Sequence, residues 1–179
     1  MVSWLRNDLS NKLIWWMKPS QDESEVSALC DIVQRGTILG EIPPYVHGDR
    51  CTVSFTEAPV IQSARLLLNA KQAGLNFIPF GFHFDRNALY QLGARQTIHQ
   101  RPEEVKWLPD SEKYRHVDLL PDKGVDFTWK REWRLATDEL AIDPALCQLI
   151  LPNRKAHEQL QQQCDHLLMF QPLFLEDLS

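Results

Sequence analysis

The chain has 179 residues, of which 44% are hydrophobic and 24% charged, and its formal net charge at pH 7 is −5. This length suits one domain with enough interior to fold without disulfides or metals. The composition excludes a disordered or fibrous chain. The acidic balance provides no global positive field, so a nucleic-acid partner is disfavoured, although a local basic groove stays compatible with it.

The four cysteines, Cys30, Cys51, Cys147 and Cys164, are scattered and form no C-x-x-C pair. We expect them to be reduced and mostly buried, because free cysteine is among the residue types found most often inside proteins. Only Cys164 and His166 have the spacing of metal ligands, and no second pair lies nearby. No metal site is therefore expected.

Residues 1–16 include Arg6, Asp8 and Lys12, which interrupt the continuous apolar core that a signal peptide requires. No run approaches the ~20 apolar residues of a transmembrane helix. The sequence therefore favours a cytoplasmic protein with no membrane partner.

The first two elements are expected from an apolar run and from helix-end signals. Residues 13–18 form a short apolar run, which predicts a strand. Ser20 and Glu23 match a capping box, and Gly36 is a natural helix stop. A helix is therefore expected over residues 21–35.

Further strands are expected in the middle of the chain, over residues 51–55, 77–84 and 95–99, because these runs are β-rich or alternate between apolar and polar residues. Thr56 follows the first of them, where its hydroxyl would either cap the next helix or bind a ligand. Asp85 follows the second and is expected to cap a short helix.

Residues 100–125 are rich in proline and show no clear period. An irregular stretch of this length in a compact domain is usually a functional loop or a lid. The alternative is a helix around residues 102–107, and the sequence leaves both open.

Alternation is strongest over residues 127–135, which predicts a strand. On that strand Lys130 and Arg134 would flank Glu132 on one face, each roughly 7 Å away. Two such cations keep a carboxylate ionised, which suits hydrogen bonding to a sugar hydroxyl or stabilising a developing cation. The alternative is an ordinary ladder of paired surface charges.

The last elements are expected to be a buried strand at 146–151, a polar helix at 153–163 and a strand at 167–174. Strands and helices are interspersed without a regular βαβ rhythm, and no linker or repeat divides the chain. These features predict a single α+β domain over residues 1–179, built on a mixed sheet.

Sequence motifs give little direct support to an enzyme class. The chain has no H-E-x-x-H, Walker A or G-x-G-x-x-G motif, and no G-x-S-x-G elbow that would support a hydrolase. The six histidines do not cluster in the sequence.

After the apolar run 13–18 come the segments ALCDIVQRGTILG (28–40), CTVSFTEAP (51–59), PFGFHFDRNALYQLGARQTIH (79–99) and DFTWKREWRL (126–135). In this order they resemble a bacterial group of small proteins related to the abortive-infection protein AbiGi, over about residues 13–152. The S-F-T-E-x-P and R-E-W-R pieces are the most specific. More distantly, the order of elements resembles the ADP-ribosyltransferase fold of DNA-modifying toxins and tRNA 2′-phosphotransferase.

This resemblance implies a split, curved, mixed β-sheet with flanking helices and a cleft that holds NAD⁺. Ser54 and Thr56 would match the hydroxyl-bearing second strand, and Glu132 the glutamate that contacts the nicotinamide ribose. Phe55 and Arg134 are assigned to the same cofactor site. The implied chemistry is loss of nicotinamide through an oxocarbenium-like state and transfer of ADP-ribose to a nucleophile, with a preorganised carboxylate as catalyst.

The first strand departs from the family pattern. It usually supplies a His or Arg that anchors the dinucleotide, but here Trp15 or Trp16 takes that place. Because these tryptophans are adjacent, a strand would send them to opposite faces. Either Lys18 substitutes for the anchor, or a tryptophan stacks on the nicotinamide, or the site has lost its cofactor.

Three functions follow from these observations. The first is an NAD-dependent transferase of a phage-defence or toxin–antitoxin system. The second is a non-enzymatic antitoxin or interaction module of the same fold, which has lost cofactor binding and acts on a protein partner from such a system. The third is a nucleic-acid-binding protein, supported only by the cluster of Lys130, Arg131 and Arg134.

Overall fold

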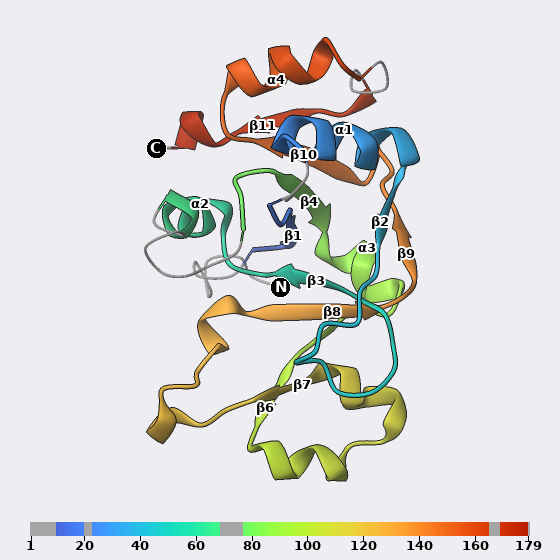
Figure 1. Ribbon diagram of the computed structural model, residues 1–179, viewed down its shortest axis with the longest axis vertical. Helices are drawn as coiled ribbons and strands as arrows, with labels where there is room; N and C mark the ends of the chain where they lie inside the picture. The colour runs from blue at the N-terminus through green and yellow to red at the C-terminus, as the bar shows by residue number, and fades with distance from the viewer. Residues whose placement is uncertain (1–9, 20–22, 69–76, 165–168, 179) are drawn as a thin grey trace.

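A seven-stranded mixed sheet runs through the middle of the molecule (Figure 1), in the order β11-β10-β4-β1-β3-β8-β5. The computed structural model describes residues 10–19, 23–68, 77–164 and 169–178. The strands of this sheet are β1 (Lys12–Trp16), β3 (Thr52–Thr56), β4 (Gly81–Asp85), β5 (Arg95–Gln96), β8 (Glu132–Ala136), β10 (Cys147–Leu151) and β11 (Pro172–Phe174). Among the described strands of this sheet, only β10 and β11 pair in parallel.

Two small sheets and several helices complete the described part of the chain. The small sheets pair β2 (Thr37–Leu39) with β9 (Glu139–Ala141), and β6 (Ile98–Gln100) with β7 (His116–Asp118). The α-helices are α1 (Glu25–Arg35), α2 (Val60–Leu68), α3 (Arg86–Gln91) and α4 (Arg154–Gln161). The 3₁₀-helices are η2 (Pro102–Trp107), η3 (Asp110–Arg115), η4 (Pro121–Lys123), η5 (Thr128–Lys130) and η7 (Leu175–Leu178). The chain is thus a single domain of mixed α/β structure.

Helices cover both faces of the main sheet. Successive residues of a strand point to opposite faces, so neighbouring residues of one strand pack on different sides of the sheet. On one face the register places Trp15 opposite Phe82, and this face joins residues of α1, α3 and α4 in the main core. On the other face Ile14 and Trp16 pack with Val60 of α2. The two tryptophans therefore point to opposite faces, as predicted.

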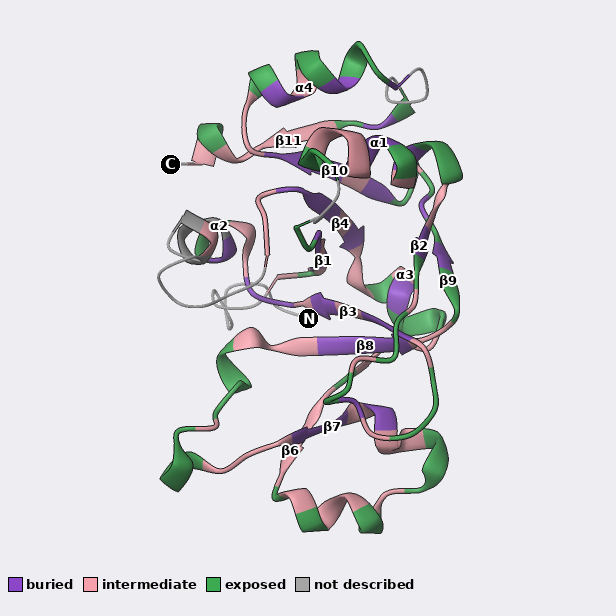
Figure 2. Ribbon diagram, viewed as in Figure 1, coloured by how far each residue is buried: buried purple, intermediate pink, exposed green. Residues whose placement is uncertain are grey.

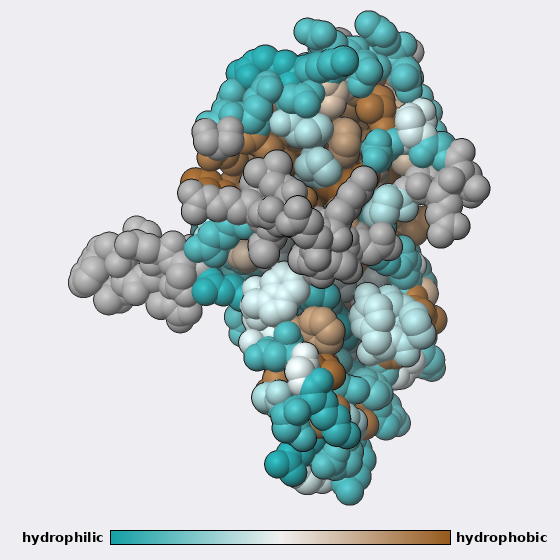
Figure 3. All heavy atoms as spheres, turned by 60° about the vertical axis from the view of Figure 1, so that its left-hand side comes forward, coloured by the Kyte–Doolittle hydropathy of each residue, from teal (hydrophilic) through white to brown (hydrophobic). Residues whose placement is uncertain are grey.

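Burial follows this layering. The central strands are buried, whereas the 3₁₀-helices beyond β8 are mostly half-buried or exposed (Figure 2). Seen from the side of α2, both ends of the molecule are mainly hydrophilic and hydrophobic residues show between them (Figure 3).

The main sheet is weakly joined between β1 and β3. β1 pairs with β4 along its full length, but with β3 only where Ile14 lies opposite Thr56. β3 in turn pairs with β8 along its full length. The two halves of the sheet therefore meet at one residue pair.

The ends of α1 differ in how well the sequence predicted them. The N-cap is Ser24, whose hydroxyl accepts from the Ser27 amide, so the helix begins after the predicted capping box. Ser20 of that box lies outside the described residues. Gly36 ends the helix with a φ of 74°, a left-handed conformation that glycine adopts without steric cost, which confirms the predicted stop.

The strand predicted over residues 127–135 begins only at Glu132, so the first half of this prediction is wrong. η5 precedes it, and Arg131 turns the chain with a φ of 44°. The Thr56 hydroxyl donates to the Lys130 carbonyl (2.6 Å) and the Glu57 amide to the Arg131 carbonyl (3.0 Å). These bonds fold the segment against the end of β3, so Lys130 does not flank Glu132 on a strand.

Residues 100–125 contain short elements instead of an open loop. η2 spans the residues for which a helix was the alternative prediction, and the Arg101 amide donates to the Glu104 carboxylate at its start. The predicted strand 95–99 is broken at Thr97 into β5 and β6. Asp85 caps α3 as predicted.

Several other elements are shorter than predicted. β4 starts at Gly81, and of the final predicted strand only β11 is present, while residues 167–168 lie outside the described residues. Three of the four cysteines are buried, and Cys51 is partly exposed. In the described part of the chain, none of the helices combines the length and apolarity needed to cross a membrane.

Replacing Phe82 tests this account of the core. Its fully buried ring contacts those of Trp15, Phe84 and Phe170. Phe82→Ala should lower the free energy of unfolding by about 3–5 kcal/mol, because it leaves a cavity that the strands cannot close. Urea unfolding followed by circular dichroism measures the change.

The control is Leu92→Ala, since the Leu92 side chain is exposed at the end of α3. This substitution should change the free energy of unfolding by about 0.5 kcal/mol or less. Equal effects of the two substitutions would show that the core does not lie on the Phe82 face.

Candidate functional site

A cavity of about 370 Å³ lies where β1 and β3 diverge. Residues of β1 and β3 line it, together with residues of α1 and β2 toward one end and of η5 and β8 toward the other. Its volume falls in the range of roughly 300–1,000 Å³ that is usual for small-molecule sites. The break in the sheet therefore coincides with a space large enough for a ligand.

This cavity brings together the residues that the sequence assigned to one site, with the exception of Arg134. Those that line it are Trp15, Trp16, Lys18, Ser54, Phe55, Thr56 and Glu132. They come from segments that are far apart in the sequence, and the antiparallel pairing of β1, β3 and β8 places them side by side.

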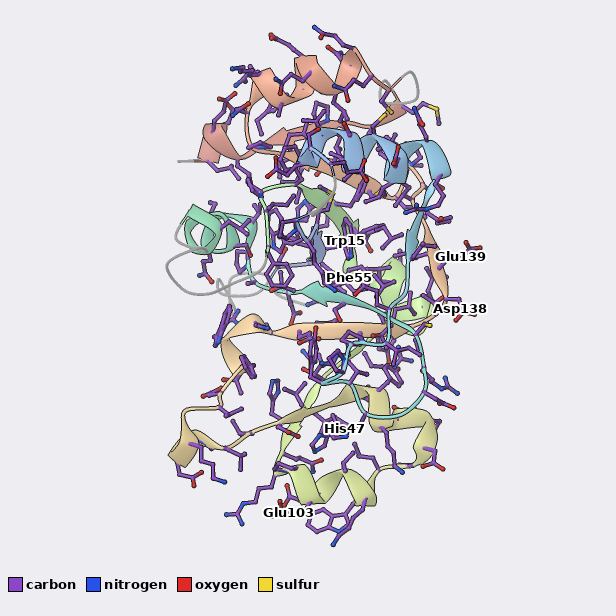
Figure 4. All side chains as sticks on the ribbon, viewed as in Figure 1. Trp15, His47, Phe55, Glu103, Asp138 and Glu139 are labelled. Atoms are coloured by element: carbon purple, nitrogen blue, oxygen red, sulfur yellow. The ribbon has the colours of Figure 1, made fainter. Side chains whose placement is uncertain are left out.

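Aromatic side chains form much of the wall. Trp15 of β1 and Phe55 of β3 lie on the same face of the sheet, close together in the middle of the molecule (Figure 4). Trp16 contributes from the opposite face. Lys18 lies at an exposed part of the lining, where it forms an ion pair with Glu41.

The two hydroxyl groups of β3 differ in their availability. Thr56 Oγ1 donates to the Lys130 carbonyl and accepts from the Ala58 amide (3.1 Å), so it already serves the backbone around the start of α2. This favours the structural alternative for Thr56. Among the described residues, no hydrogen bond occupies the half-buried Ser54 hydroxyl, which leaves it available to a ligand.

Glu132 is oriented by a buried cation. Its Oε1 accepts from Arg134 Nε at 2.7 Å. The Arg134 side chain is 1% exposed, and its Nη1 donates to the carbonyls of Tyr114 (2.6 Å) and His116 (3.2 Å). A buried ion pair is stable when further hydrogen bonds satisfy its polar atoms, and these two carbonyls meet that need.

Arg134 itself does not line the cavity. Its predicted role as a cofactor contact is therefore corrected to that of a residue that positions Glu132. The reason is geometric, because the guanidinium points from β8 toward η3 and β7, where it meets backbone carbonyls.

Lys130 lines the cavity, although the sequence analysis did not assign it to the cofactor site. Its ammonium lies 4.8 Å from the ring centroid of Phe127 and 5.7 Å from that of Trp129, and both Lys130 and Trp129 line the cavity. Burial lowers the pKa of Lys130, and the charge of Glu132 opposes this effect. A lysine directly after Trp129 and three residues after Phe127 was the available signal, since aromatic rings attract cations.

A second, smaller cavity of about 230 Å³ shares Glu132 with the first, and Glu57 and His99 also line it. Glu57 is buried, and its carboxylate accepts from Arg86 (2.5 Å), Trp133 (3.2 Å) and Gln96 (3.3 Å). These contacts hold β3, α3, β5 and β8 together. Glu57 is therefore a structural carboxylate, whereas Glu132 lines both cavities.

No family model, curated protein or solved structure matches this chain. Its function is therefore inferred from the geometry of the cavity and from the motif resemblance.

Replacing Arg134 tests its positioning role. Arg134→Met should lower the free energy of unfolding by about 3–5 kcal/mol, because Glu132 then lacks its buried partner and two carbonyls lose their donor. Chemical denaturation of the purified protein measures this loss.

The matched control is Arg154→Met. Arg154 forms ion pairs with Glu176 and Asp177 at the surface, where such pairs contribute about 1 kcal/mol or less. If Arg134→Met cost no more than Arg154→Met, the buried guanidinium would have no special role in the fold.

Proposed function

We propose that this chain binds NAD⁺ in the cavity between β1 and β3 and transfers its ADP-ribose to a nucleophile, as an ADP-ribosyltransferase-like protein of a bacterial phage-defence or toxin–antitoxin system. One observation carries the proposal. A glutamate oriented by a buried arginine lines the same cavity as the aromatic and hydroxyl side chains of the two central strands.

The lining offers contacts for each part of a dinucleotide. The half-buried Trp15 can present apolar ring surface to a nicotinamide or adenine ring, and the buried Phe55 borders the same cavity. The Ser54 hydroxyl can donate to a ribose oxygen or accept from a ribose hydroxyl.

Cations for the negatively charged diphosphate also line the cavity. They are Lys18, Arg35 and Lys130. Charge-assisted hydrogen bonds from such groups to phosphate oxygens are about twice as strong as neutral ones. These cations offer a substitute for the His or Arg that the first strand lacks.

In the proposed reaction the bond between ribose C1′ and the nicotinamide nitrogen breaks, and its electron pair leaves with nicotinamide. Positive charge develops on the ribose, where the Glu132 carboxylate stabilises it electrostatically. The acceptor nucleophile then bonds to C1′ and releases its proton to solvent. Arg134 holds one oxygen of the Glu132 carboxylate through Nε. Because the carboxylate group is rigid, this contact also orients the second oxygen.

The variant Glu132→Gln tests this mechanism. Glutamine keeps an oxygen that accepts from Arg134 but removes the negative charge. We expect NAD⁺ to bind with little change, while nicotinamide release falls by about 10²-fold or more, as when other preorganised electrostatic groups are removed. Calorimetry measures binding, and chromatography of released nicotinamide measures turnover.

The matched control is Glu139→Gln on β9, whose exposed side chain lies apart from Trp15 and Phe55 (Figure 4). It should release nicotinamide at the wild-type rate. Equal turnover in Glu132→Gln and wild type would overturn the role of Glu132, and a folded wild-type protein that does not bind NAD⁺ would overturn the function.

A second candidate function is an interaction module that binds a protein partner of the same defence system without catalysis. It is favoured by the exposed apolar side chains Leu39 and Tyr45, both of which line the cavity. Exposed apolar surface of this kind often marks an interaction site. This alternative requires that the folded wild-type protein binds no NAD⁺, so the same calorimetric measurement separates the two functions.

A further inference from the structure

Two histidines and an aspartate, His47, His116 and Asp118, meet beyond β8. His116 and Asp118 belong to β7, which lies at the end of the molecule formed by β6, β7 and the 3₁₀-helices (Figure 1), and His47 lies at the same end (Figure 4). Asp118 Oδ1 lies 3.4 Å from His47 Nε2 and 3.5 Å from His116 Nδ1. Each of the three residues offers one ligand atom, and these three atoms all lie within 4.8 Å of one another. Tetrahedral zinc with bonds of ~2.0–2.1 Å holds its donor atoms about 3.3 Å apart, which is close to both measured separations.

The fold holds this cluster in place from two sides. His116 and Asp118 stand two residues apart on β7, so their side chains share one face. β6 pairs with β7 at both positions, and Arg134 donates to the His116 carbonyl. His47 comes from the loop before β3 and meets the His116 ring edge-on, with ring centroids 4.9 Å apart.

The hydrogen bonding of His116 indicates which of its nitrogens is available. His116 Nε2 lies 3.2 Å from the Arg101 carbonyl, which can only accept, so Nε2 carries the proton. In the neutral ring, Nδ1 then has a lone pair. Metal-binding histidines are usually oriented in this way, by a hydrogen bond from the other ring nitrogen to a carbonyl or carboxylate.

The His116 Nδ1 lone pair has no hydrogen-bond partner among the described residues. It is buried and faces an Asp118 oxygen, which is also an acceptor. Two acceptors at this distance repel each other unless a cation or a proton lies between them. A bound cation at this position removes that repulsion and satisfies the Nδ1 lone pair.

The accessibility of the three side chains suits a metal ion that enters from solvent. The His116 side chain is 0% exposed, whereas those of His47 and Asp118 are 35% and 43% exposed. The described residues supply three ligands here, and the open side leaves a coordination position for water, as in zinc sites with three protein ligands.

We propose that His47, His116 and Asp118 bind a divalent transition metal ion, with Zn²⁺ as the expected occupant. Two imidazoles and one carboxylate favour such an ion over Mg²⁺ or Ca²⁺, which prefer oxygen ligands alone. The ion connects the loop before β3 to β7. This inference is independent of the proposed transferase function, because none of the three residues lines the NAD⁺ cavity.

Zinc titration of the full chain, without an affinity tag and after removal of metals by a chelator, tests the site. Calorimetry should give one Zn²⁺ per chain, and Zn²⁺ should raise Tm because it binds the folded state. The same concentration of Mg²⁺ should leave Tm unchanged.

The variants His47→Ala and Asp118→Asn should each weaken Zn²⁺ binding by more than about 100-fold, since loss of even an outer-shell partner costs about 10–100-fold. Both side chains are partly exposed, so both variants are expected to fold. His157→Ala on α4, at the opposite end of the molecule, is the control and should bind Zn²⁺ as wild type does.

Substitution with Co²⁺ identifies the ligand atoms. The proposed site should give visible absorption of a tetrahedral or five-coordinate ion without an intense near-ultraviolet thiolate band. A thiolate band, unchanged Zn²⁺ affinity in both ligand variants, or no Zn²⁺ binding by the folded wild-type chain would each overturn the proposal.

Discussion

The buried guanidinium of Arg134 is the constraint on which both candidate sites of this molecule depend. From β8 it donates in one direction to Glu132, at the cavity, and in the other to the carbonyls of Tyr114 and His116. A buried charge is tolerated only where its donors are matched, so these contacts fix η3 and β7 against the main sheet. The orientation of the candidate catalytic carboxylate and the position of the candidate metal ligand therefore rest on the same side chain.

The cavity has a separate origin, which is the divergence of β1 from β3. A fully paired sheet would close this space with backbone hydrogen bonds, whereas a single residue pair leaves room for side chains. Thr56 and Glu57, at the end of β3, then draw the chain at Lys130 and Arg131 over one end of the space. The aromatic wall thus comes from β1 and β3, and the charged end comes from η5 and β8, which the end of β3 holds in place.

Sequence patterns predicted the features that depend on neighbouring residues. The apolar run of β1, the stop of α1 at Gly36 and the cap of α3 at Asp85 follow from local chemistry, and the structure confirms them. The residues assigned to one site share a cavity, apart from Arg134, while their function stays a prediction.

Features that depend on distant residues escaped prediction. The chain departs from strand geometry at Arg131 because the carbonyl of its neighbour Lys130 accepts a hydrogen bond from Thr56. Thr56 and Lys130 are 74 positions apart in the sequence. The cluster around His116 depends on a loop at His47 and on the register of β6 with β7, and neither leaves a periodic signal in the sequence.

The two edge strands of the main sheet affect how copies of this protein can associate. An edge strand presents unpaired N–H and C=O groups, with which a strand from another molecule can pair. One edge strand is β5, which is only two residues long. The other is β11, which has three residues and begins with Pro172, a residue with no N–H to donate. Neither edge strand offers a long continuous row of unpaired N–H and C=O groups, so the sheet resists edge-to-edge growth into fibrils despite its seven strands.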